Sequence, residues 1–216
     1  MKPAFDREEV RVMGALIEKE ITTPDNYPLS LNSLTNACNQ KSNRDPVVKF
    51  DETTVTKALE RLRSKGLSRR VTGADLRVPK YYHTFDKKFG LQRRQLTVLC
   101  VLMLRGAQTV GELRSRSSRL FDFDNLEEVE SVLNELSSRV NDPLVIKLPR
   151  QPGTKEARYL HLLTREESND NTSLSDDEKI ISGHSFDDLE RKLDALANEL
   201  ECLRHEFSKI KNRFSY

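Results

Sequence analysis

The amino-acid sequence predicts a mainly α-helical protein with small β-hairpins, which is an α+β fold. Three helical patterns followed by a hairpin pattern occur twice, and the second copy starts about eighty residues after the first. Behind both copies, apolar residues recur at alternating spacings of three and four. That spacing is typical of a coiled coil. Because three helices followed by a hairpin is the order of a winged helix, we predict two tandem winged-helix domains and a C-terminal coiled-coil helix. The predicted boundaries are 1–84 for the first domain, 85–163 for the second, 164–185 for an acidic linker and 186–214 for the coiled coil.

The first two helices of the first copy are bounded by capping and proline signals. Asp6 stands three residues before Glu9, which is a capping-box spacing at the start of a helix. Pro24 and Pro28 disfavour continuation of that helix, because the residue before a proline avoids helical backbone angles. Ser30 then stands where it can cap a second, short helix.

A polar turn over 39–49 separates the second helix from the third. Asp51 can cap this third helix, and Gly66 provides a glycine at its end. Two short segments around a glycine-containing turn, 67–71 and 77–83, have the pattern of hairpin strands.

The second copy follows the same order. Its first helix is an almost continuous apolar run over 91–104. Thr109 and Glu112 have capping-box spacing before a short helix, and Asn125 begins a third helix. The two strands of its hairpin are predicted at 144–148 and 158–162.

Charge is distributed unevenly along the 216 residues. The net charge is +2, but residues 165–216 carry 8 Lys and Arg against 13 Asp and Glu, so the preceding part is basic. A basic body with an acidic tail is compatible with nucleic-acid contact. No apolar run is long enough to cross a membrane, and the first residues lack the apolar core of a secretion signal. We therefore expect a cytoplasmic protein.

Residue types that carry catalysis or bind metals are scattered. Three widely spaced cysteines form no CxxC or Cys/His set, so we expect neither a disulfide nor a zinc site. No Ser/His/Asp arrangement, carboxylate pair or glycine-rich phosphate loop is present. We expect a protein that is not an enzyme and needs no cofactor. The cysteines are Cys38, Cys100 and Cys202.

The tail predicts self-association. A lone helix with its apolar stripe would expose a long seam, which favours a partner helix. Charged pairs favour a parallel homodimer, because Glu199 would face Arg204 and Glu206 would face Lys211. A trimer, or a helix folded back on its own winged-helix domains, remains an alternative. The core positions of the coiled coil are Phe186, Leu189, Leu193, Leu196, Leu200, Leu203, Phe207, Ile210 and Phe214.

Two segments resemble a known family. ITTPDNYPLSLNSLTNACNQKSNRDPV at 21–47 and LRGAQTVGELRSRSSRL at 104–120 are similar to the YceH family of bacterial proteins. The resemblance runs from about Val10 to Leu163. It implies tandem winged-helix domains in a bacterial cytosol. It implies no biochemical activity and no catalytic residues, because the family is largely uncharacterised.

The first domain carries the residues that we expect to bind duplex DNA. A winged helix usually places its third helix in the major groove and its hairpin near the backbone. Residues 36–80 hold 11 basic and 5 acidic side chains, and phosphate contacts need such cations. Arg61 could read a guanine, because its guanidinium can donate two parallel hydrogen bonds. The candidate DNA-binding residues are Lys41, Arg44, Lys57, Arg61, Arg69, Arg70, Arg77 and Lys80.

The third helix of the second domain is acidic and favours a different partner. Glu127, Glu128, Glu130 and Glu135 would repel phosphate, which suits protein contact better. We therefore expect a DNA-binding protein, of which a transcriptional regulator is one form. The alternative is a protein-interaction scaffold similar to the ScpB-type chromosome-segregation proteins, which use tandem winged helices to hold a partner chain.

Overall fold

The computed structural model describes residues 4–73, 76–140, 142–150, 153 and 156–164. Contacts group Met1–Glu166 into one compact unit, and both predicted domains lie within it. The predicted linker beyond residue 164 and the predicted coiled coil at 186–214 fall outside the described residues.

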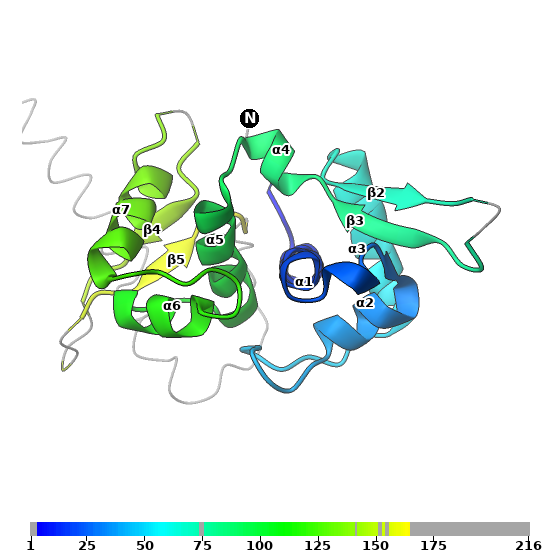
Figure 1. Cartoon of the computed structure of the whole chain (residues 1–216), viewed down its shortest axis with the longest axis horizontal. Helices are drawn as coiled ribbons and strands as arrows, with labels where there is room; N and C mark the ends of the chain where they lie inside the picture. The colour runs from blue at the N-terminus through cyan, green and yellow to red at the C-terminus, as the bar shows by residue number, and fades with distance from the viewer. Residues whose placement is uncertain (1–3, 74–75, 141, 151–152, 154–155, 165–216) are drawn as a thin grey trace, which may run out of the picture. The chain divides into compact units, whose positions relative to one another are not determined.

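The first half contains three helices and a small sheet (Figure 1). Its helices are α1 (Arg7–Thr22), α2 (Leu31–Cys38) and α3 (Glu52–Ser64), with a single 3-10 turn η1 (Pro24–Asn26) after α1. Strands β1 (Leu29–Ser30), β2 (Ser68–Val71) and β3 (Lys80–His83) pair antiparallel in the order β1–β3–β2. β2 is therefore an edge strand, and its side chains are mostly exposed.

The second half repeats the order of helices and hairpin. Its helices are α5 (Arg93–Arg105), α6 (Val110–Ser117) and α7 (Leu126–Ser137), and its strands are β4 (Val145–Lys147) and β5 (Tyr159–His161). A short helix, α4 (Phe85–Phe89), links the halves and ends at Gly90, whose φ is 63°. The α+β class and the order of elements agree with the sequence prediction, whereas β1 and α4 were not predicted.

The predicted helix starts are confirmed by capping hydrogen bonds. Asp6 accepts from the Glu9 amide at 2.7 Å, and the Glu9 carboxylate accepts from the Asp6 amide at 2.8 Å. Thr109 and Glu112 form the same reciprocal pair at the start of α6. Ser30, Asp51 and Asn125 each cap the helix predicted to follow them. Such caps satisfy amide groups that the helix itself leaves without partners.

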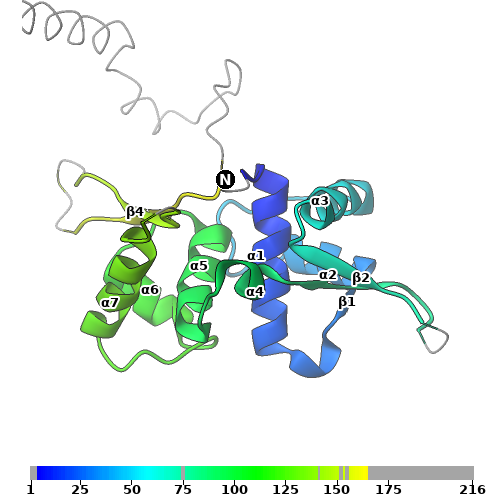
Figure 2. The ribbon, with the colours of Figure 1, turned by 90° about the horizontal axis from the view of Figure 1, so that it is seen from above.

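The core of this unit is built around the contact between α1 and α5. The two helices lie side by side in both views (Figures 1 and 2), and no other pair of elements shares as extensive a contact. Gly14 of α1 allows the approach, because a Cβ added there would lie 2.8 Å from Cδ2 of Leu104. The Sγ of Cys100 lies 3.4 Å from the Gly14 carbonyl oxygen. Burial of apolar surface along this contact joins the two halves.

The polar turn between α2 and α3 is an ordered part of this core. The Asn39 side chain donates to the Phe50 carbonyl and accepts from the Phe50 amide, each at 2.7 Å. The Asp45 amide donates to the Leu104 carbonyl at 2.9 Å. The turn therefore ties α2 and α3 to the end of α5, and its amide side chains satisfy backbone groups.

Candidate nucleic-acid interface

The cations of the first half fall into two groups according to their partners. Some are held in ion pairs or donate to backbone carbonyls inside the fold. Others extend from α3, the β2–β3 hairpin and α4, and apart from Lys88 their side chains form no hydrogen bond or ion pair within the described residues. Only the second group is available to contact a phosphate without first losing an internal partner.

Arg44 belongs to the first group, so the prediction that it binds DNA is wrong. It is 5% exposed, and its Nη2 lies 2.6 Å from the Glu18 carboxylate and 2.8 Å from the Ala37 carbonyl oxygen. Arg11 is also buried and donates to Pro46. Burial lowers the pKa of the Arg11 guanidinium, and the neighbouring Arg44 lowers it further. These arginines stabilise the turn after α2.

Arg61 also has carboxylate partners. Its Nε lies 2.7 Å from Asp6 and its Nη2 lies 3.6 Å from Glu8. Its ion pairs therefore lie at the start of α1, while 41% of its side chain is exposed, and the base-reading role stays a prediction. The exposed residues of α3 are Glu52, Thr53, Lys57, Glu60, Arg63 and Ser64.

The available cations form a basic stripe along the free edge of β2. One shallow hollow lies between α3 and β2 and is lined by Arg63, Arg69 and Arg70. A second hollow, toward α4, is lined by Arg69 together with Lys87 and Lys88. Because Arg69 belongs to both hollows, the stripe runs without a break from α3 across β2 to α4. We call Arg63, Arg69, Arg70, Lys87 and Lys88 the basic stripe.

Other predicted residues lie around the stripe. Lys57 and Lys41 are exposed on α3 and after α2, and Arg77 is exposed on the hairpin. Lys80 is half-buried and lines a different, larger hollow beside α2. The sequence prediction missed Arg63, Lys87 and Lys88. The Lys87–Lys88 pair directly after the hairpin was the available signal.

Lys88 is the least available member of the stripe. Its Nζ donates to the Lys65 carbonyl oxygen, and Lys65 in turn contacts the Glu9 carboxylate at 2.6 Å. Arg69, Arg70 and Lys87 are exposed. Glu60 is the only carboxylate that lines either hollow, so the local field favours an anion.

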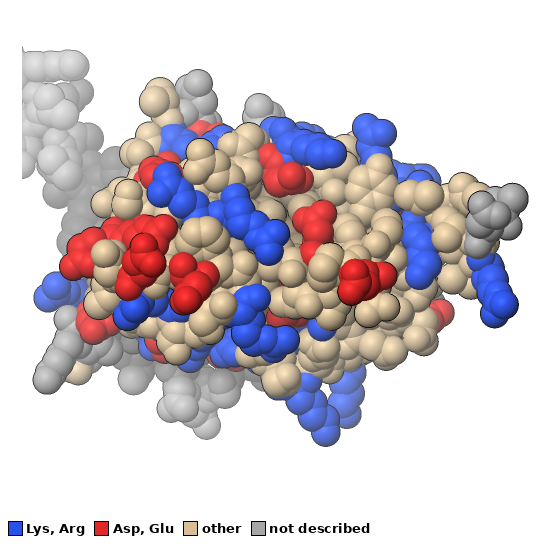
Figure 3. All heavy atoms as spheres, in the orientation of Figure 1, with Lys and Arg blue, Asp and Glu red and all other residues tan. Residues whose placement is uncertain are grey.

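The second half gathers exposed acidic side chains on α7 and on the turn before it. Glu127 and Glu130 are exposed on α7, and Asp122 and Asp124 are exposed before it. Figure 3 shows Asp and Glu gathered over this part of the molecule, whereas Lys and Arg stand out at the hairpin end. Arg94 is paired with Glu135 at 2.8 Å. The two halves therefore share an order of elements but differ in surface charge.

Elsewhere the described residues show few signs of catalysis. No group of three His, Cys, Asp or Glu side chains is placed to hold a metal ion within the described ranges. Cys38 and Cys100 are buried, and burial raises the pKa of the Cys38 thiol to about 12. His83 is buried, and its Nε2 lies 2.7 Å from the Glu20 carboxylate. In the part of the chain described, no helix is long and apolar enough to span a membrane.

The fold and its charged surface define an α+β protein whose first half carries a basic stripe beside α3. The chain belongs to the family described as "Protein of unknown function, DUF480", whose model matches residues 5–154. The resemblance to a family of uncharacterised bacterial proteins is thereby confirmed at that level.

Bacterial relatives share the name UPF0502 protein. One from Solibacter usitatus is 60% identical over 159 residues, which cover 74% of this chain and 75% of the relative. One from Hahella chejuensis is 45% identical over 218 residues, covering 97% of this chain and 98% of the relative. One from Aliivibrio salmonicida is 44% identical over 211 residues and covers 95% of each chain. The likeness to the last two therefore extends into the acidic tail. None of these names states an activity.

Proposed function

We propose that this protein binds duplex DNA through a winged helix in its first half. In this proposal α1–α3 and β1–β3 form one winged helix and α5–α7 with β4 and β5 form a second, diverged one. α3 enters the major groove, and the β2–β3 hairpin lies against the sugar–phosphate backbone. The chain acts in the cytoplasm and self-associates through its predicted coiled coil.

The observation that carries the proposal is the basic stripe beside α3. A duplex has closely spaced phosphates, and each cation that neutralises one releases a bound counterion. Arg70 and Arg63 line the hollow between β2 and α3, so they are placed to contact the backbone that runs beside a helix inserted in the groove. Arg61 is engaged in an ion pair with Asp6. The other exposed side chains of α3 that could touch base edges are either short, or include both basic and acidic groups. We therefore expect phosphate contacts to dominate the affinity.

Salt-dependent binding of the full-length protein to a fluorescent duplex tests the proposal. Replacing Arg69 and Arg70 with Ala should weaken binding to every sequence and flatten the salt dependence. Each lost phosphate contact removes about 0.9 from the slope of log K against log salt, so the double variant should lose about 1.8. The matched control replaces Arg119 and Arg150, two exposed cations of the second half, which changes the net charge equally.

The control separates a specific face from general charge attraction. If both double variants lose the same affinity, the stripe is not the binding face. If the wild-type protein shows no affinity for duplex DNA at low salt, the proposal fails.

A second function, that of a protein-interaction scaffold, is favoured by the second half. Beside the exposed carboxylates of this half, Leu126 is 45% exposed and Ile146 is 42% exposed. Acidic side chains next to exposed apolar ones suit a protein partner and not a phosphate backbone. Absence of DNA binding in the salt titration would leave this function as the better candidate.

A further inference from the structure

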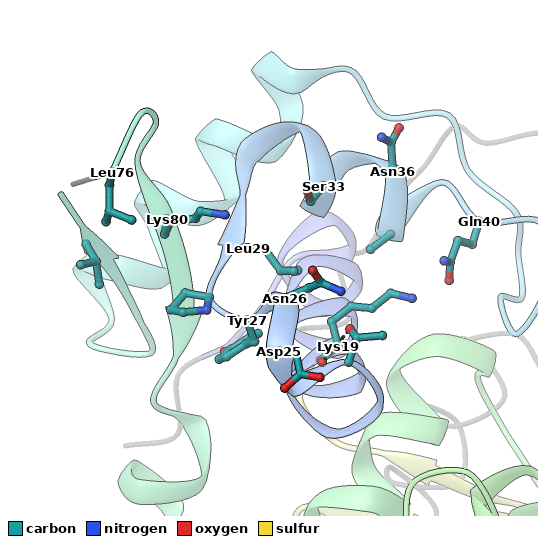
Figure 4. Close-up of a pocket in the computed structure, with 14 residues that line it drawn as sticks. Lys19, Asp25, Asn26, Tyr27, Leu29, Ser33, Asn36, Gln40, Leu76 and Lys80 are labelled. Carbon is teal, nitrogen blue, oxygen red and sulfur yellow. Dashed lines mark hydrogen bonds between the residues drawn. The ribbon is translucent and has the colours of Figure 1, made fainter. Parts of the chain in front are cut away.

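A large hollow of the first half lies apart from the basic stripe. It has a volume of about 760 Å³ and is bounded by α1, η1, α2 and the β2–β3 hairpin (Figure 4). That volume falls within the roughly 300–1,000 Å³ that is usual for small-molecule sites. The hollow is thus large enough for a ligand, and its position beside α2 links it to the proposed DNA-binding module.

The charge of the walls favours an anion. Lys19 enters from α1 and Lys80 from β3, whereas Asp25 is the single carboxylate among the lining residues. Figure 4 shows the Lys80 side chain extending from β3 toward Leu29 and α2. Among the described residues, the side chain of Lys80 forms no hydrogen bond or ion pair. Its ammonium group therefore has three donors available to a ligand.

The remaining polar side chains favour a ligand with hydrogen-bonding groups. Asn26 makes no side-chain hydrogen bond within the described part of the chain, and its amide can both donate and accept. Figure 4 shows Asn36 on α2 and Gln40 on the loop that follows the end of α2. The Asn36 amide donates to Asn32, and the Gln40 oxygen accepts from Arg44. The Oδ1 atom of Asn36 and the Nε2 atom of Gln40 therefore remain available to a ligand.

The apolar part of the hollow favours a ligand that also carries a ring. Leu29 and Ala37 are buried at its floor, and Tyr27 lies beside them. On the hairpin side, Val71 is 36% exposed and Leu76 is 37% exposed. A ring between these walls would cover apolar surface that otherwise faces water.

We propose that this hollow binds a small organic anion that carries a ring, and that the bound anion is held between Lys80 of the hairpin and the amide side chains that line the hollow on η1 and α2. The anionic group contacts Lys80, and the ring rests against Leu29 and Leu76. A carboxylate group or a phosphate group could make this contact, so the experiment uses one probe of each kind to tell the two classes of ligand apart.

The position of the hollow couples it to DNA binding, and this part of the inference rests on the proposed function. Lys80 belongs to the same hairpin as Arg69 and Arg70. A ligand that holds the hairpin at a fixed distance from α2 changes the placement of those arginines relative to α3. By linkage, a ligand that changes DNA affinity by some factor has its own affinity changed by DNA by the same factor.

Calorimetry on the full-length protein without DNA tests the site. The probes are adenosine monophosphate for the phosphate arm and 4-hydroxybenzoate for the carboxylate arm. We expect saturable binding of one probe with a Kd below about 1 mM. Replacing Lys80 with Gln should weaken that binding about tenfold or more, because a charged hydrogen bond to the anion is lost. The same change at Lys49, which is exposed outside the hollow, should have no effect.

Two results would overturn the site: neither probe binds, or the Lys80→Gln and Lys49→Gln variants lose affinity equally. The coupling is tested by repeating the DNA titration with the bound probe at saturation, and unchanged DNA affinity would overturn it. Because the calorimetry contains no DNA, failure of the proposed function leaves the test of the site intact.

Discussion

Replacing Gly14 with Ala should destabilise the protein, although the same substitution usually stabilises a helix. Gly14 lies in the middle of α1, where Ala is favoured over Gly by about 1 kcal/mol of helix propensity. The added methyl group would lie 2.9 Å from Cγ of Leu104 and 3.2 Å from Cβ of Met103. Ordinary carbon–carbon contacts are about 3.5–4.0 Å, so α5 or its side chains must move.

The magnitude follows from these opposing contributions. Overpacking a close core contact costs about 1–3 kcal/mol. Subtracting the propensity gain leaves a net loss of about 0–2 kcal/mol. Gly111 provides the matched control, because it lies exposed in α6 and an added Cβ there meets nothing within 4 Å. Gly111→Ala should therefore stabilise the protein by up to about 1 kcal/mol.

Urea denaturation followed by far-ultraviolet circular dichroism measures both changes, which suits a chain without tryptophan. The free energies of unfolding of the two variants should differ by about 1–3 kcal/mol. If Gly14→Ala stabilises the protein as much as Gly111→Ala, the reasoning is refuted. A double-mutant cycle with Leu104→Ala adds a second test, because removing the obstructing side chain should relieve the overpacking and give a favourable coupling energy.

Three further predictions concern stability, thiols and self-association. The hydrogen bond from His83 lowers the pKa of the Glu20 carboxyl. The stabilisation from this bond is therefore present above the unfolded-state pKa of Glu20 and is lost as pH falls through the lower folded-state pKa. In urea titrations, the destabilisation caused by Glu20→Gln should be largest near pH 7 and should shrink between about pH 5 and 3. A chain ending at residue 163 retains only two cysteines, Cys38 and Cys100. Burial raises the pKa of both thiols, so a reagent that reacts with thiolates should label them at pH 8 only after the chain unfolds. Rapid labelling of the native chain would contradict this. Light scattering should show the full chain as a dimer and the chain ending at residue 163 as a monomer at micromolar concentration, and a monomeric full chain would exclude the predicted coiled-coil dimer.

The elements that sequence analysis located correctly are those specified by local chemistry. Asp6, Ser30, Asp51 and Asn125 each cap the helix predicted to begin beside them, because a capping bond joins residues only two or three positions apart. The two-residue strand β1 was missed, since its pairing with β3 joins residues about fifty positions apart. The predicted boundary between residues 84 and 85 lies at the start of α4, and this short helix was not predicted. Gly90, directly after it, is a signal for the end of a helix.

The packing of α1 on α5 could not be predicted for a related reason. An apolar stripe shows that a helix face is buried but does not name the partner that covers it. α5 is apolar on almost every side, and the structure explains this, because it packs against α1 as well as against α6 and α7. Gly14 was not distinguished from other helical glycines, since its role depends on Leu104, ninety residues later in the chain.

The candidate interface shows why a count of cations is a weak predictor of a binding face. Lys and Arg between α2 and the hairpin look equivalent in sequence, yet Arg44 is buried against Glu18 and Arg61 is paired with Asp6. Their partners come from α1 and the residue before it, so the pairing becomes visible only after the helices pack. Breaking a buried pair leaves an uncompensated charge and costs about 3–5 kcal/mol, so replacing Arg44 by Ala should unfold the turn, and under the proposed function it would weaken DNA binding without removing a DNA contact. Loss of binding in that variant alone is therefore no evidence of a DNA contact. Arg69 and Arg70 lack such partners among the described residues, and for that reason substitutions there report on the surface itself.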